Sequence, residues 1–275
     1  MQIQDHALRD LRAHRHLSED AAHQLAGWFL SGTANSDDMV SVLQALHEKG
    51  ETVDELVGFI RAMRAVMAPI LLSTSPLIDV CGTGGSLSNR FNTSTCVAMV
   101  LGAMGHPVAK HGNRGSKKAN GSFDFLDALG VPYELSPSEH QNQLDRYGCT
   151  FLFARLYHPA VGHVAPARKQ LGTPSIFNLI GPFCNPASPS IQVIGAPTQQ
   201  LADTVLAVGE RLGYDTIAAV SSDIGLDECS TVGQSTIQGV RQGQPFTLKE
   251  IKRIYINKTR SPIFSNRFHY ICKCI

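Results

Sequence analysis

One candidate anion-binding segment of this sequence is Gly-Thr-Gly-Gly at positions 82–85. It follows a short apolar run, residues 77–81, that predicts a buried strand, and it precedes an apolar stretch, residues 94–105, that predicts a helix. Glycines at such a turn let the backbone approach a phosphate closely, with several N–H groups pointing the same way. The segment is neither a Walker A loop nor a dinucleotide fingerprint, because no Gly-Lys-Ser/Thr follows and the Gly-x-Gly-x-x-Gly spacing is absent. Glycine-rich turns also occur without a function, so this segment alone leaves both explanations open.

Polar side chains at the start of the expected helix are the second candidate. Asn92, Thr93, Ser94 and Thr95 suit a helix N-cap, which is the ordinary explanation for such residues. The alternative is a second phosphate contact, made by the hydroxyl groups and the first helical N–H groups, with one hydroxyl available to a metal ion. Anion contacts at two successive segments favour a diphosphate over a single phosphate.

Positive charge collects after the next expected strand, residues 107–109. Residues 110–114 read Lys-His-Gly-Asn-Arg, Lys117 and Lys118 follow, and the segment ends at Ser122. A solvated basic loop is one explanation. The four cations at positions 110, 114, 117 and 118 repel one another unless an anion is bound, however, so the pattern favours an anionic substrate.

Two adjacent carboxylates, Asp227 and Glu228, follow an expected strand at residues 216–221. An acidic pair in a loop is usually only surface. Opposite a phosphate site the pair could hold Mg²⁺, which takes oxygen ligands and often binds through one or two carboxylates.

Arginines and histidines cluster in the middle of the chain. Arg168 could clamp a substrate carboxylate through a bidentate guanidinium, although sequence spacing does not prefer it over Arg155. His158 and His163 are five residues apart with no acidic ligand nearby, so we do not expect a zinc site.

The elements that must position these residues fall into two parts. Residues 1–70 predict amphipathic helices, with caps at Ser18 and Ser36 and a capping box at Thr52 and Glu55. Further strands are expected at 150–156 and 191–195, with a helix near 200–212. Strands that alternate with helices predict an α/β fold with a mostly parallel central sheet, whose ligands bind beyond the carboxyl ends of the strands.

Composition narrows the class of protein further. The 275 residues are 43% hydrophobic and 17% charged, which excludes global disorder. No apolar run approaches the ~20 residues that a membrane span needs, and the first residues do not predict a signal peptide. Seven scattered cysteines without a Cys-x-x-Cys pair are typical of a reducing cytoplasm with buried thiols.

Charge separates the end of the chain from the rest. Residues 249–275 hold seven Lys or Arg and one Glu, a net charge of +6, which leaves residues 1–248 with a net charge of −5. The acidic body argues against a general nucleic-acid-binding protein.

The motifs together resemble one family, the anthranilate phosphoribosyltransferases. The similarity rests on DVCGTGG at 79–85, FNTST at 91–95, KHGNR at 110–114, HPA at 158–160, IFNLIGPFCNP at 176–186 and GLDE at 225–228. It runs from the N-terminal helices to about residue 245. The resemblance implies transfer of the phosphoribosyl group of 5-phosphoribosyl diphosphate to anthranilate, with release of diphosphate, in tryptophan biosynthesis. It also implies Mg²⁺ as cofactor, small-molecule substrates, a cytoplasmic location and a homodimer formed through the helical part.

The resemblance further implies a domain organisation and site residues. Residues 1–70 are a helical domain joined by helices within about 165–185, residues 71–248 are the α/β domain, and residues 249–275 are an atypical basic tail, shortened or altered relative to the family. Metal ligands are Ser94, Asp227 and Glu228. Anthranilate contacts are Gly82, Asn113 and Arg168, and no residue is a covalent nucleophile. Phosphoribosyl diphosphate contacts are Gly82, Gly85, Ser86, Arg90, Asn92, Thr93, Ser94, Thr95, Lys110, His111, Gly112, Asn113, Arg114, Gly115, Ser116, Lys117, Lys118 and Ser122.

Four departures from the family pattern concern the phosphate segments, at Ser86, Arg90, Lys117 and Lys118. Two alternatives to the implied function stay open. One is a nucleoside phosphorylase or another phosphoribosyl transferase on the same fold. The other is an inactive relative that binds nucleic acid or a partner through the basic tail.

Overall fold

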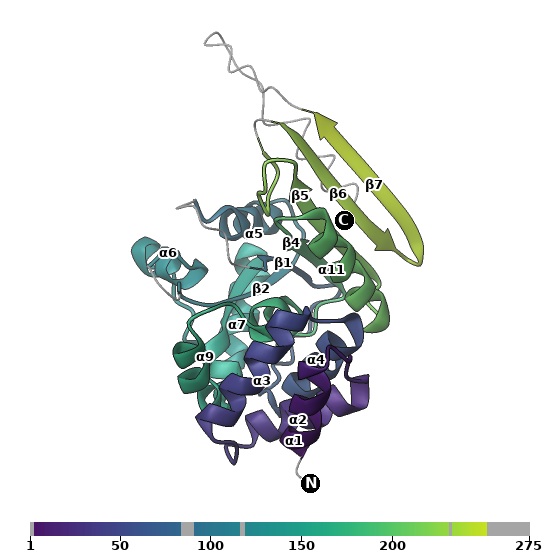
Figure 1. The fold of residues 1–275 in the computed structure, drawn as a ribbon. Helices are drawn as coiled ribbons and strands as arrows, with labels where there is room; N and C mark the ends of the chain where they lie inside the picture. Colours follow the sequence, from purple (N-terminus) through teal and green to yellow (C-terminus); the bar gives the residue numbers. More distant parts are fainter. Residues whose placement is uncertain (1–2, 84–90, 116–118, 231–232, 252–275) are drawn as a thin grey trace.

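The chain folds into a bundle of helices joined to a β-sheet that helices cover (Figure 1). The computed structural model describes residues 3–83, 91–115, 119–230 and 233–251. The helical bundle lies at the N-terminal end of the molecule, and the sheet extends away from it toward β7. This arrangement confirms the predicted fold class, a small N-terminal helical domain with a larger α/β domain around a mostly parallel sheet.

Four helices form the bundle: α1 Ile3–Arg12, α2 Glu19–Leu30, α3 Ser36–Lys49 and α4 Val53–Val66. As predicted, Ser18 caps α2, and Thr52 with Glu55 forms the capping box of α4. The predicted cap of α3 is wrong by one residue, because Asn35 accepts the capping hydrogen bond and Ser36 takes the first helical position. Asparagine is as favourable an N-cap as serine, so the sequence alone did not separate the two.

Seven strands form one sheet in the order β3-β2-β1-β4-β5-β6-β7. Their bounds are β1 Ile78–Gly82, β2 Val108–Gly112, β3 Cys149–Phe153, β4 Ile191–Gly195, β5 Thr216–Ser222, β6 Gln234–Arg241 and β7 Gln244–Ile251. The first five strands are parallel, and β6 and β7 are antiparallel to their neighbours. The chain runs from β1 outward to β3 and returns on the other side of β1 with β4. This reversal of strand order is the place where parallel sheets bind ligands.

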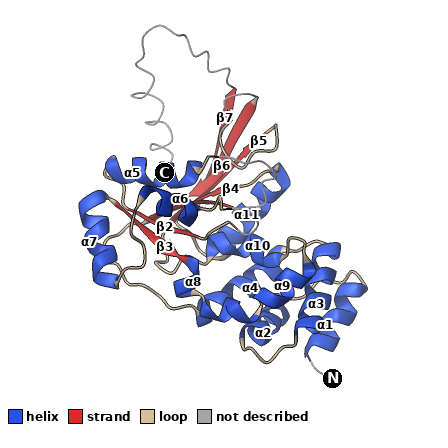
Figure 2. Ribbon diagram, turned by 90° about the vertical axis from the view of Figure 1, so that its left-hand side faces the viewer, coloured by secondary structure: helices blue, strands red, loops and turns tan. Residues whose placement is uncertain are grey.

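Helices flank the sheet (Figure 2). They are α5 Thr93–Ala103, α6 Ser122–Leu129, α7 Pro137–Tyr147 and α11 Gln199–Arg211. α5 packs on β1 and β2, whereas α11 packs on β5 and β6. Both agree with the predicted helices to within two residues at each end.

Short helices return the chain to the bundle between β3 and β4. They are α8 Ala154–Tyr157, the 3₁₀ helix η1 Pro159–His163, α9 Ala165–Leu171, α10 Ile176–Ile180 and the 3₁₀ helix η2 Gly181–Phe183. α9 packs on α3, and α10 packs on α4. Phe59 links the two parts, with its ring centroid 6.1 Å from that of Phe29 and 5.8 Å from that of Phe177. The bundle therefore shares one hydrophobic core with the segment that follows β3.

Two strand predictions need correction, and two further strands were missed. β3 ends at Phe153 and not at residue 156, because residues 154–157 form α8. β2 runs on through Gly112, so Lys110 lies inside a strand and not in a loop after it. The hairpin of β6 and β7 was not predicted, and it carries regular structure to Ile251, three residues past the expected boundary at 248. Its turn is Gln242-Gly243, whose φ values of 50° and 74° fit a two-residue hairpin loop.

Among the described residues, no helix has the length and apolar content to cross a membrane.

A buried ion pair between Lys49 and Glu55 joins three segments of the bundle. The Glu55 carboxylate accepts hydrogen bonds from Lys49 Nζ at 2.9 Å and from the backbone N–H groups of Leu17 at 2.9 Å and Thr52 at 2.8 Å. The side chains of Glu55 and Lys49 are 0% and 1% exposed. One carboxylate therefore ties the entry to α2, the end of α3 and the start of α4 together.

Glu55→Ala should lower the free energy of unfolding by about 3–5 kcal/mol, because it leaves the Lys49 charge buried without its partner. Urea unfolding followed by circular dichroism measures this. The double variant Glu55→Leu with Lys49→Met is the control, and it should recover part of the loss. A loss below about 1 kcal/mol in Glu55→Ala would place the pair among ordinary surface salt bridges.

Candidate functional site

The glycine turn begins at the carboxyl end of β1, next to the strand-order reversal. Gly82 pairs with Gly195 of β4, and the N–H of Thr83 donates to Gly195 O at 3.0 Å. Thr83 is buried, and its hydroxyl has no hydrogen-bond partner among the described residues. An unsatisfied buried hydroxyl is costly unless a ligand completes it, so this position suits a polar ligand. The predicted contacts Gly85, Ser86 and Arg90 lie outside the described residues.

The N-terminus of α5 supplies the second predicted anion contact. Asn92 occupies the N-cap position, but its side chain makes no capping hydrogen bond. Thr93 and Ser94 are half-buried, and Thr95 is fully buried with an unsatisfied hydroxyl among the described residues. The helix turn next to β1 thus presents N–H groups and hydroxyls, which is the arrangement that binds phosphate at helix N-termini.

The end of β2 differs from the predicted cationic loop. Lys110 is 1% exposed, and its ammonium donates to Val80 O at 2.6 Å inside the sheet. Arg114 pairs with Asp127 at 2.8 Å and donates to the Tyr133 hydroxyl at 2.7 Å. Among the described residues, therefore, the expected repulsion of unpaired cations is absent, because protein groups already partner both side chains. Lys117, Lys118 and Ser116 lie outside the described residues.

The turn after β2 is shaped by hydrogen bonds to Asp124 of α6. Its Oδ2 accepts from the N–H groups of Gly115 and Gly121, each at 2.8 Å. Asn113 lies at the exit of β2, where its side-chain oxygen accepts from the N–H of Arg114 at 2.8 Å. The hydroxyl of Ser122 lies beside Gly112, so both predicted contacts belong to the same turn.

Two buried histidines face each other behind this turn. The rings of His111 and His158 lie 5.2 Å apart, edge to face. Burial lowers the pKa of His111 to about 3, helped by the neighbouring His158 and Lys110, and burial also lowers the pKa of His158. His158 Nε2 lies 2.8 Å from the carbonyl oxygen of Cys184 and donates to it. His111 Nε2 is buried without a partner among the described residues, so it is available to a ligand at the end of β2.

The acidic loop packs against the carboxyl end of β4. Asp227 O approaches Gly195 so closely that a side chain on Gly195 would collide with it. Asp227 and Glu228 are both half-buried. Because Gly195 also pairs with Gly82 and accepts from Thr83, the acidic pair and the glycine turn meet at the same edge of the sheet. The spacing of the sequence did not show this contact.

The structure separates the two arginines that the sequence left equivalent. Arg155 is exposed on α8. Arg168 is half-buried on α9, with its guanidinium 5.7 Å from the centre of the Phe177 ring and 3.4 Å from Asn178 Oδ1. Burial lowers the pKa of Arg168. His163 instead packs against Gly32 of the bundle, so it does not join His158 in a metal site.

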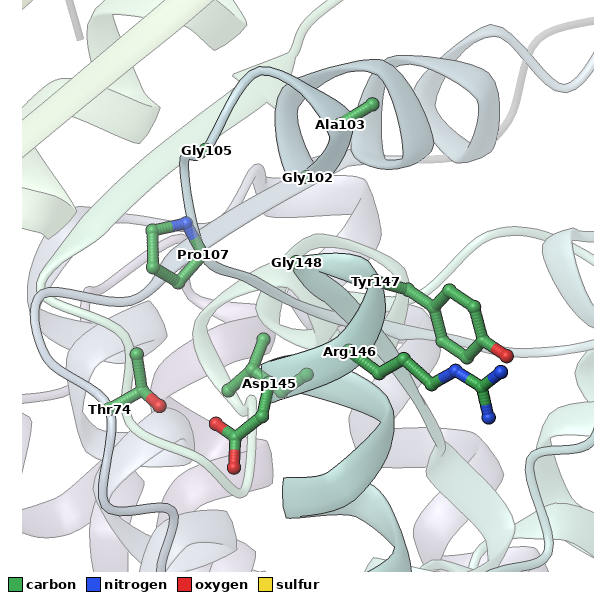
Figure 3. A pocket seen from close by; sticks show the side chains of 10 residues that line it. Thr74, Gly102, Ala103, Gly105, Pro107, Asp145, Arg146, Tyr147 and Gly148 are labelled. Carbon is green, nitrogen blue, oxygen red and sulfur yellow. The ribbon is translucent and has the colours of Figure 1, made fainter.

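A cavity of about 610 Å³ lies at the other end of the sheet (Figure 3). Its lining includes Pro107, which precedes β2, and Gly148, which precedes β3. Arg146 and Tyr147 lie side by side at its rim, as Figure 3 shows. The predicted site residues follow the carboxyl ends of the strands, so this cavity is distinct from the candidate site.

Comparison with known proteins identifies the class. Residues 5–67 match the glycosyl transferase family helical bundle domain, and residues 74–264 match the glycosyl transferase family a/b domain. The second match runs past residue 245, where the sequence-based resemblance ended. Together they describe the two-part architecture seen here.

Individual relatives narrow the class to one family. The chain is 42% identical over 227 residues to the anthranilate phosphoribosyltransferase of Geobacillus kaustophilus, covering 82% of this chain and 67% of the relative. The crystal structure of that enzyme from Thermus thermophilus superimposes with a TM-score of 0.79 at 34% identity, covering 89% of this chain and 73% of the other. The Saccharomyces cerevisiae enzyme in complex with PRPP and Mg gives a TM-score of 0.79 at 25% identity, with coverages of 89% and 72%. The chain belongs to the anthranilate phosphoribosyltransferase family, which confirms the resemblance.

The neutral state of His111 makes stability depend on pH. The folded-state pKa of about 3 lies below the unfolded value near 6.5, so between these values only the unfolded chain takes up the proton. Stability is therefore full above pH 6.5 and falls by about 1.4 kcal/mol per pH unit below it for this group.

The check is urea unfolding at several pH values between 6.5 and 4.5, for wild type and His111→Gln. Because His158 and His140 shift in the same direction, wild type alone does not isolate His111. The slope of stability against pH should be shallower in the variant by about 1.4 kcal/mol per unit. Equal slopes would mean that His111 is protonated in the folded state.

Proposed function

We propose that this chain transfers the phosphoribosyl group of 5-phosphoribosyl diphosphate to anthranilate, giving N-(5-phosphoribosyl)anthranilate and diphosphate. The observation that carries the proposal is the meeting of three anion- and cation-binding elements at one sheet edge. The Gly82–Thr83 turn, the N-terminus of α5 and the Asp227 loop converge on Gly195 and β1. Membership of the anthranilate phosphoribosyltransferase family supports the same activity.

The phosphate groups would bind where unsatisfied donors gather. Thr83 and Thr95 offer buried hydroxyls, and the first turn of α5 offers N–H groups with the positive end of its dipole. These groups would orient the diphosphate so that the ribose carbon lies in front of the acceptor. Positioning of this kind supplies a large part of the rate, because it converts a bimolecular encounter into reaction within one complex.

The donors near the acidic loop fit Mg²⁺. Ser94, Asp227 and Glu228 offer a hydroxyl and carboxylates, the hard oxygen donors that Mg²⁺ takes, and none of the three is a soft ligand. The Saccharomyces cerevisiae relative, whose structure is a complex with PRPP and Mg, supports this assignment. When bound, the ion would neutralise charge that develops on the leaving diphosphate.

The amine of anthranilate is a neutral nucleophile at pH 7, so no side chain must be activated to attack. Arg168 is the proposed partner of the anthranilate carboxylate, since its half-buried guanidinium is held by stacking on Phe177. Neutral His111 offers an unpartnered ring nitrogen at the exit of β2, beside Asn113. We assign the acceptor side of the site to these three residues.

We propose a cytoplasmic homodimer. Among the described residues Cys81, Cys96, Cys149 and Cys184 form no disulfide bond, which suits a reducing compartment. The half-buried apolar side chains of the bundle, Leu8, Trp28 and Val40, supply apolar surface for a dimer contact. Light scattering coupled to size-exclusion chromatography tests this, and a monomer at micromolar concentration would contradict it.

The activity is tested by mixing the protein with anthranilate, 5-phosphoribosyl diphosphate and Mg²⁺ while anthranilate fluorescence is followed. The proposal expects a decrease that requires all three components. Phosphorolysis of pyrimidine nucleosides without that decrease would favour a nucleoside phosphorylase. Salt-sensitive binding of DNA or RNA without either reaction would favour the non-catalytic alternative.

Asp227→Ala with Glu228→Ala should lower turnover by about 10²-fold or more, while the melting temperature changes little, because the pair would act on the cation and not in the core. Activity is titrated with Mg²⁺ for wild type and variant. Asp203→Ala with Glu210→Ala on α11 is the charge-matched control and should keep wild-type turnover. An unchanged Mg²⁺ dependence in the 227–228 variant would remove the pair from the metal site.

Arg168→Lys should raise the KM for anthranilate by about tenfold and leave that for 5-phosphoribosyl diphosphate nearly unchanged, because lysine cannot reproduce a bidentate fork. Arg155→Lys is the matched control, since the exposed Arg155 lies on the neighbouring short helix. Initial rates with each substrate varied in turn give the two constants. Equal increases for both substrates would show that Arg168 holds the local structure instead.

A further inference from the structure

The parallel pairing between β1 and β2 is confined to one end of the two strands. Ile78 with Val108 is the only register pair between these two strands, both of which are fully described. By contrast, β1 pairs with β4 at five positions, and β2 pairs with β3 at five positions. Toward the carboxyl ends, β1 and β2 are therefore joined by something other than the regular backbone ladder.

Asp79 supplies the first of these connections. Its Oδ1 accepts the backbone N–H of His111 at 3.2 Å, a donor that a regular ladder would pair with a carbonyl. Its Oδ2 accepts from Asn185 Nδ2 at 2.9 Å and from Gln192 Nε2 at 3.2 Å. Asn185 also donates to Ala109 O at 2.8 Å. One carboxylate thus joins β1, β2, β4 and the segment after η2.

Lys110 supplies the second connection in the opposite direction. Its ammonium crosses from β2 to the carbonyl oxygen of Val80 on β1, at 2.6 Å. The side chains of Asp79, Lys110 and Asn185 are all at least 98% buried. Burial raises the pKa of the Asp79 carboxyl, and the charge of Lys110 acts most strongly against this rise. The three hydrogen-bond partners of Asp79 are all donors, which fits its carboxylate form.

We propose that Asp79, Lys110 and Asn185 form a polar wedge that holds the carboxyl ends of β1 and β2 apart and fixes the distance between the two loops that leave them. Gly82 follows Asp79 by three residues, and Asn113 follows Lys110 by three residues. On the proposed function these loops hold the phosphoribosyl diphosphate and the acceptor amine, so the wedge sets the approach of the two substrates. Its members are positioning residues, and Lys110 acts through the strand and not by direct contact with phosphate.

Charge and geometry are separated by comparing two variants. Asp79→Asn leaves Lys110 as an uncompensated buried charge and turns one acceptor into a donor, so it should lose both stability and turnover. Asp79→Asn with Lys110→Met removes both charges, so it should regain much of the thermal stability. The wedge predicts that kcat of the double variant nevertheless stays about 10²-fold below wild type, because the loops remain misplaced. Recovery of kcat to within about threefold of wild type would overturn the proposal.

Thr150→Val is the control for destabilisation without displacement. Thr150 is buried on β3, where its hydroxyl bonds His140 Nδ1 at 2.8 Å and Gln143 Oε1 at 2.6 Å. The variant should lower the melting temperature while kcat at 25 °C stays near the wild-type value. If Thr150→Val lost as much turnover as the Asp79 variants, the effect at Asp79 would follow from destabilisation alone, and the proposal would fail.

A readout that does not need activity separates this inference from the proposed function. The His111 amide proton should be protected from exchange in wild type and exposed in Asp79→Ala, which keeps no side-chain acceptor, whereas the amide of Cys81, on the β4-paired strand β1, should keep its protection. Nuclear magnetic resonance of labelled protein resolves the two amides. Unchanged protection of His111 would overturn the wedge. A wild-type protein with the predicted protection but no turnover would refute the proposed function and leave the wedge standing.

Discussion

The charge of Asp79, buried at the centre of the sheet, is the constraint on which the rest of the structure depends. A carboxylate removed from water costs several kcal/mol unless donors and an opposite charge surround it. Here the donors come from positions 111, 185 and 192, and the opposite charge comes from position 110. β1, β2, β4 and the turn at Asn185 must therefore all be correctly placed before this charge is satisfied. If any of these elements is misplaced, the buried carboxylate loses a partner and its desolvation free energy is not compensated. This cost favours a single arrangement of the elements.

The segment that ends at Asn185 also connects the sheet to the helical bundle. Arg64 of α4 donates from Nε to Phe183 O at 2.8 Å and from Nη2 to the Tyr214 hydroxyl at 2.9 Å. His158 donates to the carbonyl of Cys184, one residue before Asn185. Arg64 of the bundle and His158 thus hold the adjacent carbonyl groups of Phe183 and Cys184. The bundle consequently does more than cover the sheet, since it orients the α9–α10 region that carries Arg168.

Much of this architecture could be predicted from the sequence, because periodicity and turn chemistry act locally. The strand, glycine turn and helix around Gly82 follow from an apolar run, glycines and an N-cap signature within 30 residues. The convergence of Asp227 on Gly195 could not be predicted, because it depends on strand order, which no local pattern encodes.

The burial of individual charged side chains could not be predicted from the sequence either. Lys110 and Arg114 look alike in sequence, as the two cations of one Lys-His-Gly-Asn-Arg segment, yet one lies inside the sheet and the other pairs with Asp127. Whether a lysine lies in a strand or in the loop after it depends on where the strand ends. Strand ends are the part of the structure that a sequence pattern predicts least well. The hairpin of β6 and β7 was missed for a related reason. Its strands carry many polar residues, and alternation alone marks their inner positions.

The alternation of side chains along β5, β6 and β7 shows which face of this part of the sheet α11 covers. Ile217 packs against Gly209 of α11, and Gln238 bonds Gln199 and Asp203 of the same helix, so these residues mark the face that α11 covers. Their neighbours point to the opposite face, where Val220, Ile237, Phe246 and Leu248 are only half-buried. An apolar sheet face is stable when a second layer packs on it. A second layer packed on this face would therefore stabilise the β5–β7 region.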